Sequence, residues 1–590
     1  MKRLRLLVFA LALAHSLACP LLADPGPADT EFDKVADEYI KGWLAAHPIT
    51  ATQLGIHDFD GRISDFTRLS LDAELSRLRR FDERLKRFDA TKLAPDKAVD
   101  LRILQAAIRK DLFDFQAANT FENNPMVYAQ AIDVNVYIKR NFAPLEERVR
   151  SIVTIENQVP NIMIAAKTNL APVLPRPFVE LAIQIARGNA DFLKKDLVEA
   201  LKNLKDERLR AAFHAANRKA WMALTDYANW LEKDRLPKAI AEWPLGEQKY
   251  RQMLAETELL NMEPAKVLEI GMAELKREQA AFEEAARIID PSRPAHEVFK
   301  DVKKDHPTPD SLIPDTAKTL EAIREFVVKK DLVSIPSKER AKVDATPKFA
   351  RATSFASMDT PGPFEKKATE AYYYVTPTEP EWPEQQKEEW LTAFNYYTTE
   401  VVSIHEAYPG HYTQFLHLNA SPASRVAKIF RSYAFVEGWA HYTEKMMLDA
   451  GYGASTNPTP GEDDVKSAAK YRMAQADEAL LRLCRLVASI KMHTQGMTVD
   501  EATRFFMENC HYEEKPARSE AMRGTYDPGY LNYTLGKLMI LKLRKDYEAQ
   551  EGADFSAKKF HDELLKHGMP PIPILREIML KDKAKWAEVL

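Results

Sequence analysis

The segment HEAYPGH, residues 405–411, carries two histidines and a glutamate that together could bind and use a metal ion. In the His-Glu-x-x-His signature of zinc peptidases, histidines four residues apart on one helical face bind zinc, and the glutamate beside the first activates water. Here two extra residues precede the second histidine. A regular helix would place His411 about 120° round the axis and roughly 9 Å along it from His405, which separates the pair.

Pro409 and Gly410 predict a distortion that removes this separation. Proline has no N–H for the carbonyl of His405, and glycine tolerates unusual dihedral angles. We expect a bulge that loops out the surplus residues and returns His411 beside His405. One amphipathic pattern runs over residues 384–418 and predicts a single long helix around the bulge. The alternative is a kinked core helix whose histidines are only hydrogen-bonded. HDELLKH, residues 561–567, has the same histidine spacing but no glutamate directly after the first histidine and no helix break, and we interpret it as surface.

A third ligand is found in FVEGWAHYTEKMM, residues 435–447. Glu437, His441 and Glu444 are spaced i, i+4 and i+7, so they share one helical face. An acid buried there should be paired or metal-bound, because burying it alone is costly. A catalytic zinc commonly takes two histidines and one carboxylate. We therefore predict Glu437 as the third ligand, with His441 and Glu444 as hydrogen-bonding partners or, less favoured, ligands themselves. The alternative is an ordinary solvated helix face.

HEAYPGH followed by EGWAHYTE resembles the bacterial domain-of-unknown-function 885 family, whose members carry HExxPGH and later EGWA, and which looks like a distant branch of the zincin metallopeptidases. HPITATQLGIHDFDGRISD (47–65) and SEAMRGTYDPGYLNYTLGKLMILKLR (519–544) are similar to that family's opening and closing segments. The resemblance implies a mainly α, multi-helix, two-lobed zincin-like fold with a deep cleft. His441 departs from the family pattern, which has an apolar residue there, and this leaves the ligand set open.

The chemistry of these residues predicts peptide or amide hydrolysis. One zinc ion held by the two histidines and Glu437 would polarise a water, and Glu406 would take its proton and pass it to the leaving amine. Tyr533 matches a tyrosine of the family and is predicted to stabilise the oxyanion. Arg523 could bind a substrate carboxylate through two hydrogen bonds. The alternatives are a catalytically silent peptide-binding protein and a zinc hydrolase of a non-peptide amide or ester.

The helical pattern dominates the rest of the chain. Apolar residues at three- and four-residue spacing predict helices over 31–48, 71–88, 97–115, 146–170, 210–233 and 264–289. Residues 371–376 predict a strand, in a small β element around 350–377, whose edge could bind an extended peptide. We predict an N-terminal helical lobe over residues 24–260 and a zinc-binding lobe over 261–590.

The first residues predict export. Residues 1–23 have a basic start, an apolar run and small residues, which is the layout of a secretory signal peptide. We expect a periplasmic protein, with a lipid anchor at Cys19 as the less favoured alternative. No later stretch has 18 consecutive apolar residues, so no transmembrane helix is expected in the mature chain. The formal net charge of -4 gives no reason to expect a nucleic-acid partner. The oligomeric state stays open.

Overall fold

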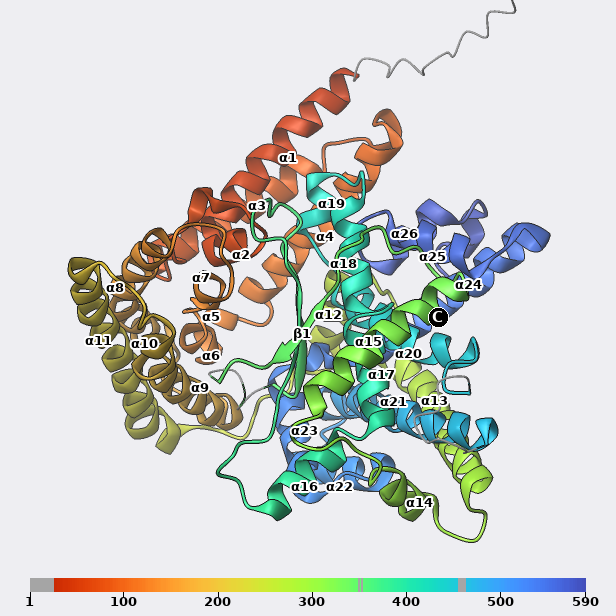
Figure 1. Cartoon of the computed structure of the whole chain (residues 1–590). Helices are drawn as coiled ribbons and strands as arrows, with labels where there is room; N and C mark the ends of the chain where they lie inside the picture. The colour runs from red at the N-terminus through yellow and green to blue at the C-terminus, as the bar shows by residue number, and fades with distance from the viewer. Residues whose placement is uncertain (1–25, 349–350, 352–353, 455–462) are drawn as a thin grey trace, which may run out of the picture.

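The structure is a computed structural model that describes residues 26–348, 351, 354–454 and 463–590. The predicted leader and Cys19 lie outside the described residues. The described chain is mostly helical, with one small sheet (Figure 1). This confirms the predicted mainly α fold class.

The N-terminal helices follow from the spacing of their apolar residues. In α1, Phe32, Val35, Tyr39 and Ile40 lie on one face and are buried. α8, α9 and α11 pack together at the left of Figure 1 and bury a core of their own. The helices are α1 (Pro27–Ala46), α2 (Pro48–Gln53), α3 (Arg68–Leu85), α4 (Pro95–Gln116), α5 (Thr120–Asn123), α6 (Met126–Ala129), α7 (Asn135–Lys139), α8 (Leu145–Asn169), α9 (Arg176–Lys194), α10 (Asp196–Ala200) and α11 (Glu207–Trp230).

The second half of the chain builds the largest core around α21. This helix of 31 residues is buried on most of its circumference, as expected for a helix inside a large protein. The helices are α12 (Glu247–Thr257), α13 (Pro264–Ile289), α14 (Ala295–Val302), α15 (Leu312–Lys329), α16 (Glu384–Ala393), α17 (Tyr396–Glu406), α18 (His411–Ala420), α19 (Arg425–Ile429), α20 (Tyr433–Asp449), α21 (Asp464–Thr494), α22 (Val499–Cys510), α23 (Glu514–Tyr526), α24 (Asn532–Glu551), α25 (Ala557–Leu565) and α26 (Ile572–Met579).

A third core joins the two halves, because α1 and α4 bury apolar residues against α19 and against Ile574 of α26. α12 packs in the largest core together with α21. The helices predicted over 31–48, 71–88, 97–115, 146–170, 210–233 and 264–289 are confirmed as α1, α3, α4, α8, α11 and α13. The division into lobes at residue 260 stays a prediction.

The small sheet has three strands in the order β1-β3-β2. β3 (Tyr372–Val375) pairs in parallel with β1 (Lys342–Ala345) and antiparallel with β2 (Ala356–Asp359). The predicted strand over 371–376 is therefore confirmed, but the expectation that its edge is open is wrong, since β1 and β2 occupy both sides. The outer edge of β2 faces the second half of the molecule, where Met358 contacts Glu406.

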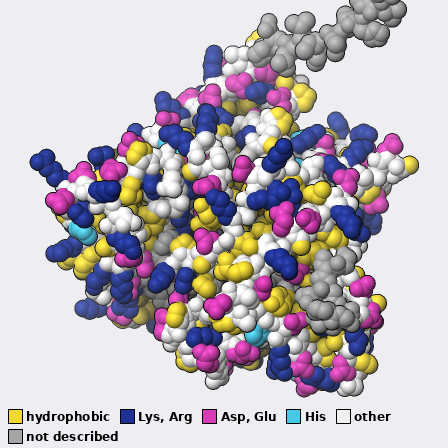
Figure 2. Space-filling view, in the orientation of Figure 1, with side chains coloured by type: hydrophobic (Ala, Val, Ile, Leu, Met, Phe, Trp, Pro, Cys, Tyr) yellow, Lys and Arg dark blue, Asp and Glu magenta, His cyan; other side chains and the backbone are white. Residues whose placement is uncertain are grey.

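Acidic and basic side chains are both spread over the face shown in Figure 2. Among the helices of the described residues, none combines the length and the apolar character needed to cross a membrane.

Candidate metal centre

The two histidines of HEAYPGH lie on two separate helices. α17 ends at Glu406, a turn follows that contains the cis peptide bond between Tyr408 and Pro409, and α18 begins at His411. The predicted bulge in a continuous helix is wrong in form, because the chain leaves the helix completely. α16 and α17 are also separate helices, since the side chain of Asn395 caps α17 by accepting from the N–H of Thr398 at 2.9 Å.

The turn nevertheless brings the histidines together as predicted. The ring centroids of His405 and His411 are 4.8 Å apart. Gly410 is required in the turn, because a Cβ there would overlap the carbonyl oxygens of Ile404 and His405. The N–H of Gly410 donates to the carbonyl of Ile404 at 3.0 Å, and the indole of Trp439 donates to the carbonyl of Pro409 at 2.9 Å.

Glu437 of α20 completes a group of three side chains that we call the histidine–glutamate cluster: His405, His411 and Glu437. Their nearest ligand atoms all lie within 4.8 Å of one another. Oε2 of Glu437 is 3.5 Å from Nε2 of His405 and 3.5 Å from Nε2 of His411.

These separations are longer than the 2.7–3.2 Å or so of an N–H···O hydrogen bond. They are close to the roughly 3.4 Å between two ligands on a tetrahedral zinc whose bonds are about 2.0–2.1 Å long. The donor set of two imidazoles and one carboxylate is also the set that suits catalytic zinc. The residues therefore fit a zinc ion in both chemistry and spacing.

Glu444 of α20 lies behind the cluster and orients His405. Its Oε1 accepts from Nδ1–H of His405 at 2.7 Å, and its Oε2 accepts from Nδ1–H of His441 at 3.0 Å. The guanidinium of Arg482, on α21, lies 3.4 Å from Oε1 of the same carboxylate. Because Nδ1 is engaged by Glu444, Nε2 is the ring nitrogen of His405 that faces Glu437 and would bind a metal ion after loss of its proton.

Neighbouring groups of opposite charge keep Glu437 and His405 ionised although both are largely buried. Burial opposes ionisation of Glu437, but His411 and His405 lower its pKa below its usual range. For His405, burial lowers the pKa, and the neighbouring carboxylates of Glu437 and Glu444 outweigh this and raise it to about 9. Burial lowers the pKa of His441 to about 3, so this histidine is neutral.

Glu406 points from the end of α17 toward the sheet. Its Oε2 accepts from the N–H of Met358, on the outer edge of β2, at 3.0 Å. One carboxylate oxygen is thus fixed by the backbone of an edge strand. This places the candidate base between the cluster and the sheet.

Tyr533 reaches the cluster because α20 and α24 cross closely. Gly438 and Gly536 meet at the crossing, where a Cβ on Gly536 would overlap the carbonyl oxygen of Ala434. The ring of Tyr533 lies 6.5 Å from that of His405 between centroids. Burial and the nearby Glu437 raise the pKa of Tyr533, so its hydroxyl stays protonated.

Two side chains already engage the guanidinium of Arg523. Its Nε donates to Asp527 at 3.0 Å, and its terminal nitrogen donates to the hydroxyl of Tyr433 at 3.2 Å. The ring of Tyr433 in turn packs edge-on against Tyr533, with centroids 5.8 Å apart. The catalytic roles assigned to Arg523 and Tyr533 stay predictions.

Sequence reasoning missed three contributors to this site: the N–H of Met358, Tyr433 and Arg482. Met358 and Arg482 lie far from the motifs in sequence, and only the folded chain brings them there. Tyr433 stands four residues before Glu437, so helical spacing could have placed it on the same face. His561 was also misread as surface: it is fully buried and hydrogen-bonds Tyr442 and the carbonyl of Leu332.

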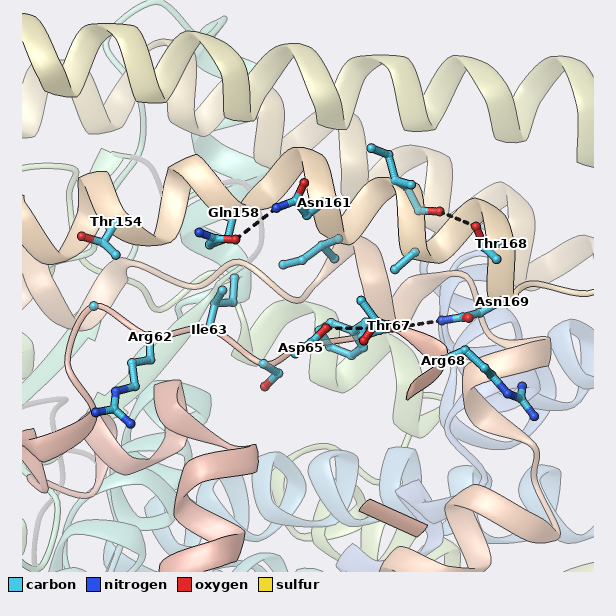
Figure 3. Close-up of a pocket in the computed structure, with 16 residues that line it drawn as sticks. Arg62, Ile63, Asp65, Thr67, Arg68, Thr154, Gln158, Asn161, Thr168 and Asn169 are labelled. Atoms are coloured by element: carbon cyan, nitrogen blue, oxygen red, sulfur yellow. Dashed lines mark hydrogen bonds between the residues drawn. The ribbon is translucent and has the colours of Figure 1, made fainter. Parts of the chain in front are cut away.

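Two cavities are lined by residues that contact the candidate base or Tyr533, although no residue of the cluster itself lines either one. One of about 340 Å³ is lined by Met358 and Asp359 of β2, and we call it the β2 cavity. The other, of about 600 Å³, is lined by Trp243 and Tyr433, and we call it the Trp243 cavity. A third cavity, of about 670 Å³, lies between residues 61–68 and α8 and is called the α8 cavity (Figure 3).

Fold and site together define a large, mainly helical protein with a buried cluster of side chains that could hold a metal ion. The chain belongs to the family described as "Bacterial protein of unknown function (DUF885)", whose model matches residues 48–579. The zincin relationship expected from the resemblance stays a prediction. No curated protein matches the chain.

Solved structures show the same fold. One, described as a candidate lipoprotein of unknown function from Shewanella oneidensis, has 25% sequence identity and a TM-score of 0.76, and the match covers 93% of this chain and 100% of that one. Another, described as a candidate lipoprotein from Colwellia psychrerythraea, has 16% identity and a TM-score of 0.75, with 95% of this chain and 99% of that chain covered.

Proposed function

We propose that the chain is an exported, zinc-dependent peptidase that hydrolyses short peptides. The observation that carries this proposal is the geometry of the histidine–glutamate cluster, in which the carboxylate of Glu437 stands at ligand spacing from two imidazoles. Bound there, zinc would supply Lewis acidity at the scissile carbonyl and its attacking water. The hydrogen bond between Nδ1 of His405 and Glu444, which turns Nε2 toward Glu437, supports the same role.

The chain's own residues supply the proton transfers. Glu406 is half-buried and has one oxygen fixed by Met358, so its other oxygen can take a proton from water and deliver it to the leaving amine. Tyr533, protonated at neutral pH, would donate a hydrogen bond to the developing oxyanion. The outer edge of β2 offers backbone groups to an extended peptide beside this base.

The test is metal content and hydrolysis measured on the same preparations. Purified mature protein should carry about one zinc and cleave a mixed peptide library, lose activity with a chelator, and regain it with added zinc. Glu437→Ala should lose the zinc, whereas the matched surface variant Glu207→Ala should keep it. A wild type that holds no zinc after supplementation would leave HEAYPGH as a hydrogen-bonded turn in a binding protein. Zinc binding with cleavage of esters or non-peptide amides alone would instead favour the non-peptide hydrolase.

Export is supported by the layout of residues 1–23 and by the description of the Shewanella structure as a candidate lipoprotein. That description also favours acylation of Cys19 over a free periplasmic protein. Expression of the full chain with labelled palmitate tests this directly. Label in the wild type and none in Cys19→Ala, with release of that variant from the membrane fraction, would establish the anchor. An unlabelled wild type in the soluble periplasmic fraction would exclude it.

A further inference from the structure

Arg431 stands directly before the N-cap of α20 and differs from the other arginines near the cluster. Arg482 is paired with Glu478, Arg485 with Glu520, and Arg523 with Asp527. Arg431 has no carboxylate partner among the described residues. Its guanidinium carbon lies 5.4 Å above the ring of Phe415 and its side chain is exposed to solvent. A cation that is stacked on an aromatic ring but unpaired is available to an anionic ligand.

The two cavities near the cluster meet at this side chain. Arg431 lines the β2 cavity together with Met358, whose N–H binds Glu406, and it lines the Trp243 cavity together with Tyr433. It lies two residues before the start of α20, the helix that carries Glu437. A ligand in either cavity therefore lies within reach of Arg431.

The charges around Arg431 favour a single negative group. The β2 cavity is also lined by Lys139 and Arg140. Of its two acids, Asp359 is bound to Arg140 at 2.6 Å and Asp133 accepts from the side-chain amide of Gln53 at 3.0 Å. At the N-terminus of α20, the carboxylate of Glu258 accepts from the N–H of Ala434 at 3.1 Å and from the hydroxyl of Ser432. This acid occupies the anion-binding end of the helix and disfavours a multiply charged phosphate there.

The other cavity offers an apolar wall. Phe113, Val173, Phe178, Ile240 and Trp243 line the Trp243 cavity. Its volume of about 600 Å³ suits side chains of a short peptide rather than a single ion. Apolar side chains and one carboxylate are what a short peptide with a free C-terminus presents.

We propose that Arg431 binds the carboxylate of the peptide substrate and so restricts the enzyme to short peptides with a free carboxylate near the scissile bond. This inference rests on the proposed function and names its substrate class. A carboxylate at the C-terminus and one on an acidic side chain share this chemistry. The guanidinium fork matches either through two parallel hydrogen bonds.

The test is equilibrium binding by calorimetry to zinc-loaded protein in a Glu406→Gln background, so that peptides are not consumed. The probes are one apolar tripeptide as the free acid, as the C-terminal amide, and as an amide whose last residue is glutamate. The free acid should bind at least tenfold tighter than the amide. Arg431→Ala should remove that difference by weakening the acid alone, Arg431→Lys should restore part of it, and the surface control Arg518→Ala should leave it unchanged.

The outcomes separate this inference from the proposed function. Hydrolysis by the wild type with an acid-to-amide ratio that Arg431→Ala does not change overturns the role of Arg431 and leaves the peptidase standing. Binding that depends on Arg431 in a protein that cleaves no peptide upholds the carboxylate site and overturns the peptidase. Preference for the glutamate amide over the free acid would assign the carboxylate to a side chain. If no probe binds, the inference is wrong.

Discussion

Polar side chains line the α8 cavity and also make up the histidine–glutamate cluster. The two regions differ in how these side chains are hydrogen-bonded and paired. In the α8 cavity the polar groups are satisfied locally: Asn161 donates to Gln158 at 3.2 Å and Thr168 to the carbonyl of Ile164 at 3.0 Å, both within one helix (Figure 3). Asn169 reaches across to the carbonyl of Phe66 at 2.7 Å. These are neutral hydrogen bonds, and the first two are exposed to solvent.

In the cluster, charged groups from separate helices compensate one another in the interior. α17, α18 and α20 each supply a side chain, and α21 supplies the guanidinium behind them. Each of these buried charged groups would be destabilising alone. Their presence together in the interior is therefore a sign of a functional site. The larger cavity is therefore the weaker candidate site. Perturbed, convergent titratable groups mark the place where chemistry is expected.

The variant expected to separate the two regions most strongly is Glu406→Gln. Removal of a general base should lower the rate of peptide hydrolysis by about 10²–10⁴-fold, while the zinc content stays at the wild-type level. Gln158→Ala in the α8 cavity should leave the rate unchanged. Initial rates on one peptide, with metal measured in each sample, test both. Full activity in Glu406→Gln would show that another group takes the proton.

A smaller effect is expected from Glu444→Gln. The loss of the charge that fixes Nδ1–H of His405 should weaken zinc binding by about 10–100-fold, as for other partners of metal-ligating histidines. Glu478→Gln is the matched control, since Glu478 also pairs with Arg482 but does not touch a histidine. Competition with a chromophoric chelator measures both affinities. Equal losses in the two variants would mean that Glu444 acts through the arginine alone.

The glycine crossing of α20 and α24 gives a comparison in stability. Gly536→Ala places a Cβ against the carbonyl of Ala434, and overpacking of this kind costs about 1–3 kcal/mol. Gly188→Ala, in the exposed part of α9, meets no atom within 4 Å and should be neutral or stabilising by up to about 1 kcal/mol. Denaturant unfolding of both variants decides this. If the two behave alike, the close crossing is not needed to hold α24.

The sequence predicted the helices well because their apolar spacing is regular over many turns, as in α1 and α13. The prediction failed where the hydrophobic periodicity carries little information. β1 has only four residues, Lys342–Ala345, with no run of β-branched or aromatic side chains, so the place of β3 inside the sheet was not foreseen. The amphipathic pattern also continues across Asn395, whose capping of α17 is a local signal that competes with it.

The candidate site was predictable as far as its residues lie in two short motifs. The spacing of Glu437, His441 and Glu444 fixes their common face on any helix, and Pro409 with Gly410 marks where the chain must turn. Tertiary partners were not predictable. The sequence near Arg431 does not show that this side chain lies unpaired where two cavities meet. The sequence near Met358 likewise does not show that its N–H binds Glu406.

The smallest effect on chemistry is expected from Glu156, in α8, the helix that lines the cavity of Figure 3. Its Oε1 accepts from Asn217 at 2.9 Å and burial raises the pKa of its carboxyl to about 8. The folded state thus holds the proton more tightly than the unfolded state, where the pKa is about 4.3. Stability is highest below the lower value, falls as the pH rises toward 8, and changes no further above it.

Glu156→Gln should therefore equal the wild type in stability near pH 4, exceed it by a few kcal/mol at pH 9, and leave zinc binding and hydrolysis unchanged. Glu147→Gln, at an exposed position on the same helix, removes the same charge and should not alter the pH dependence. Urea unfolding midpoints across this range measure the slope. If the slope persists in Glu156→Gln, the titrating group lies elsewhere. If Glu156→Gln loses zinc binding, α8 and the cluster are coupled, and the contrast between the two regions no longer holds.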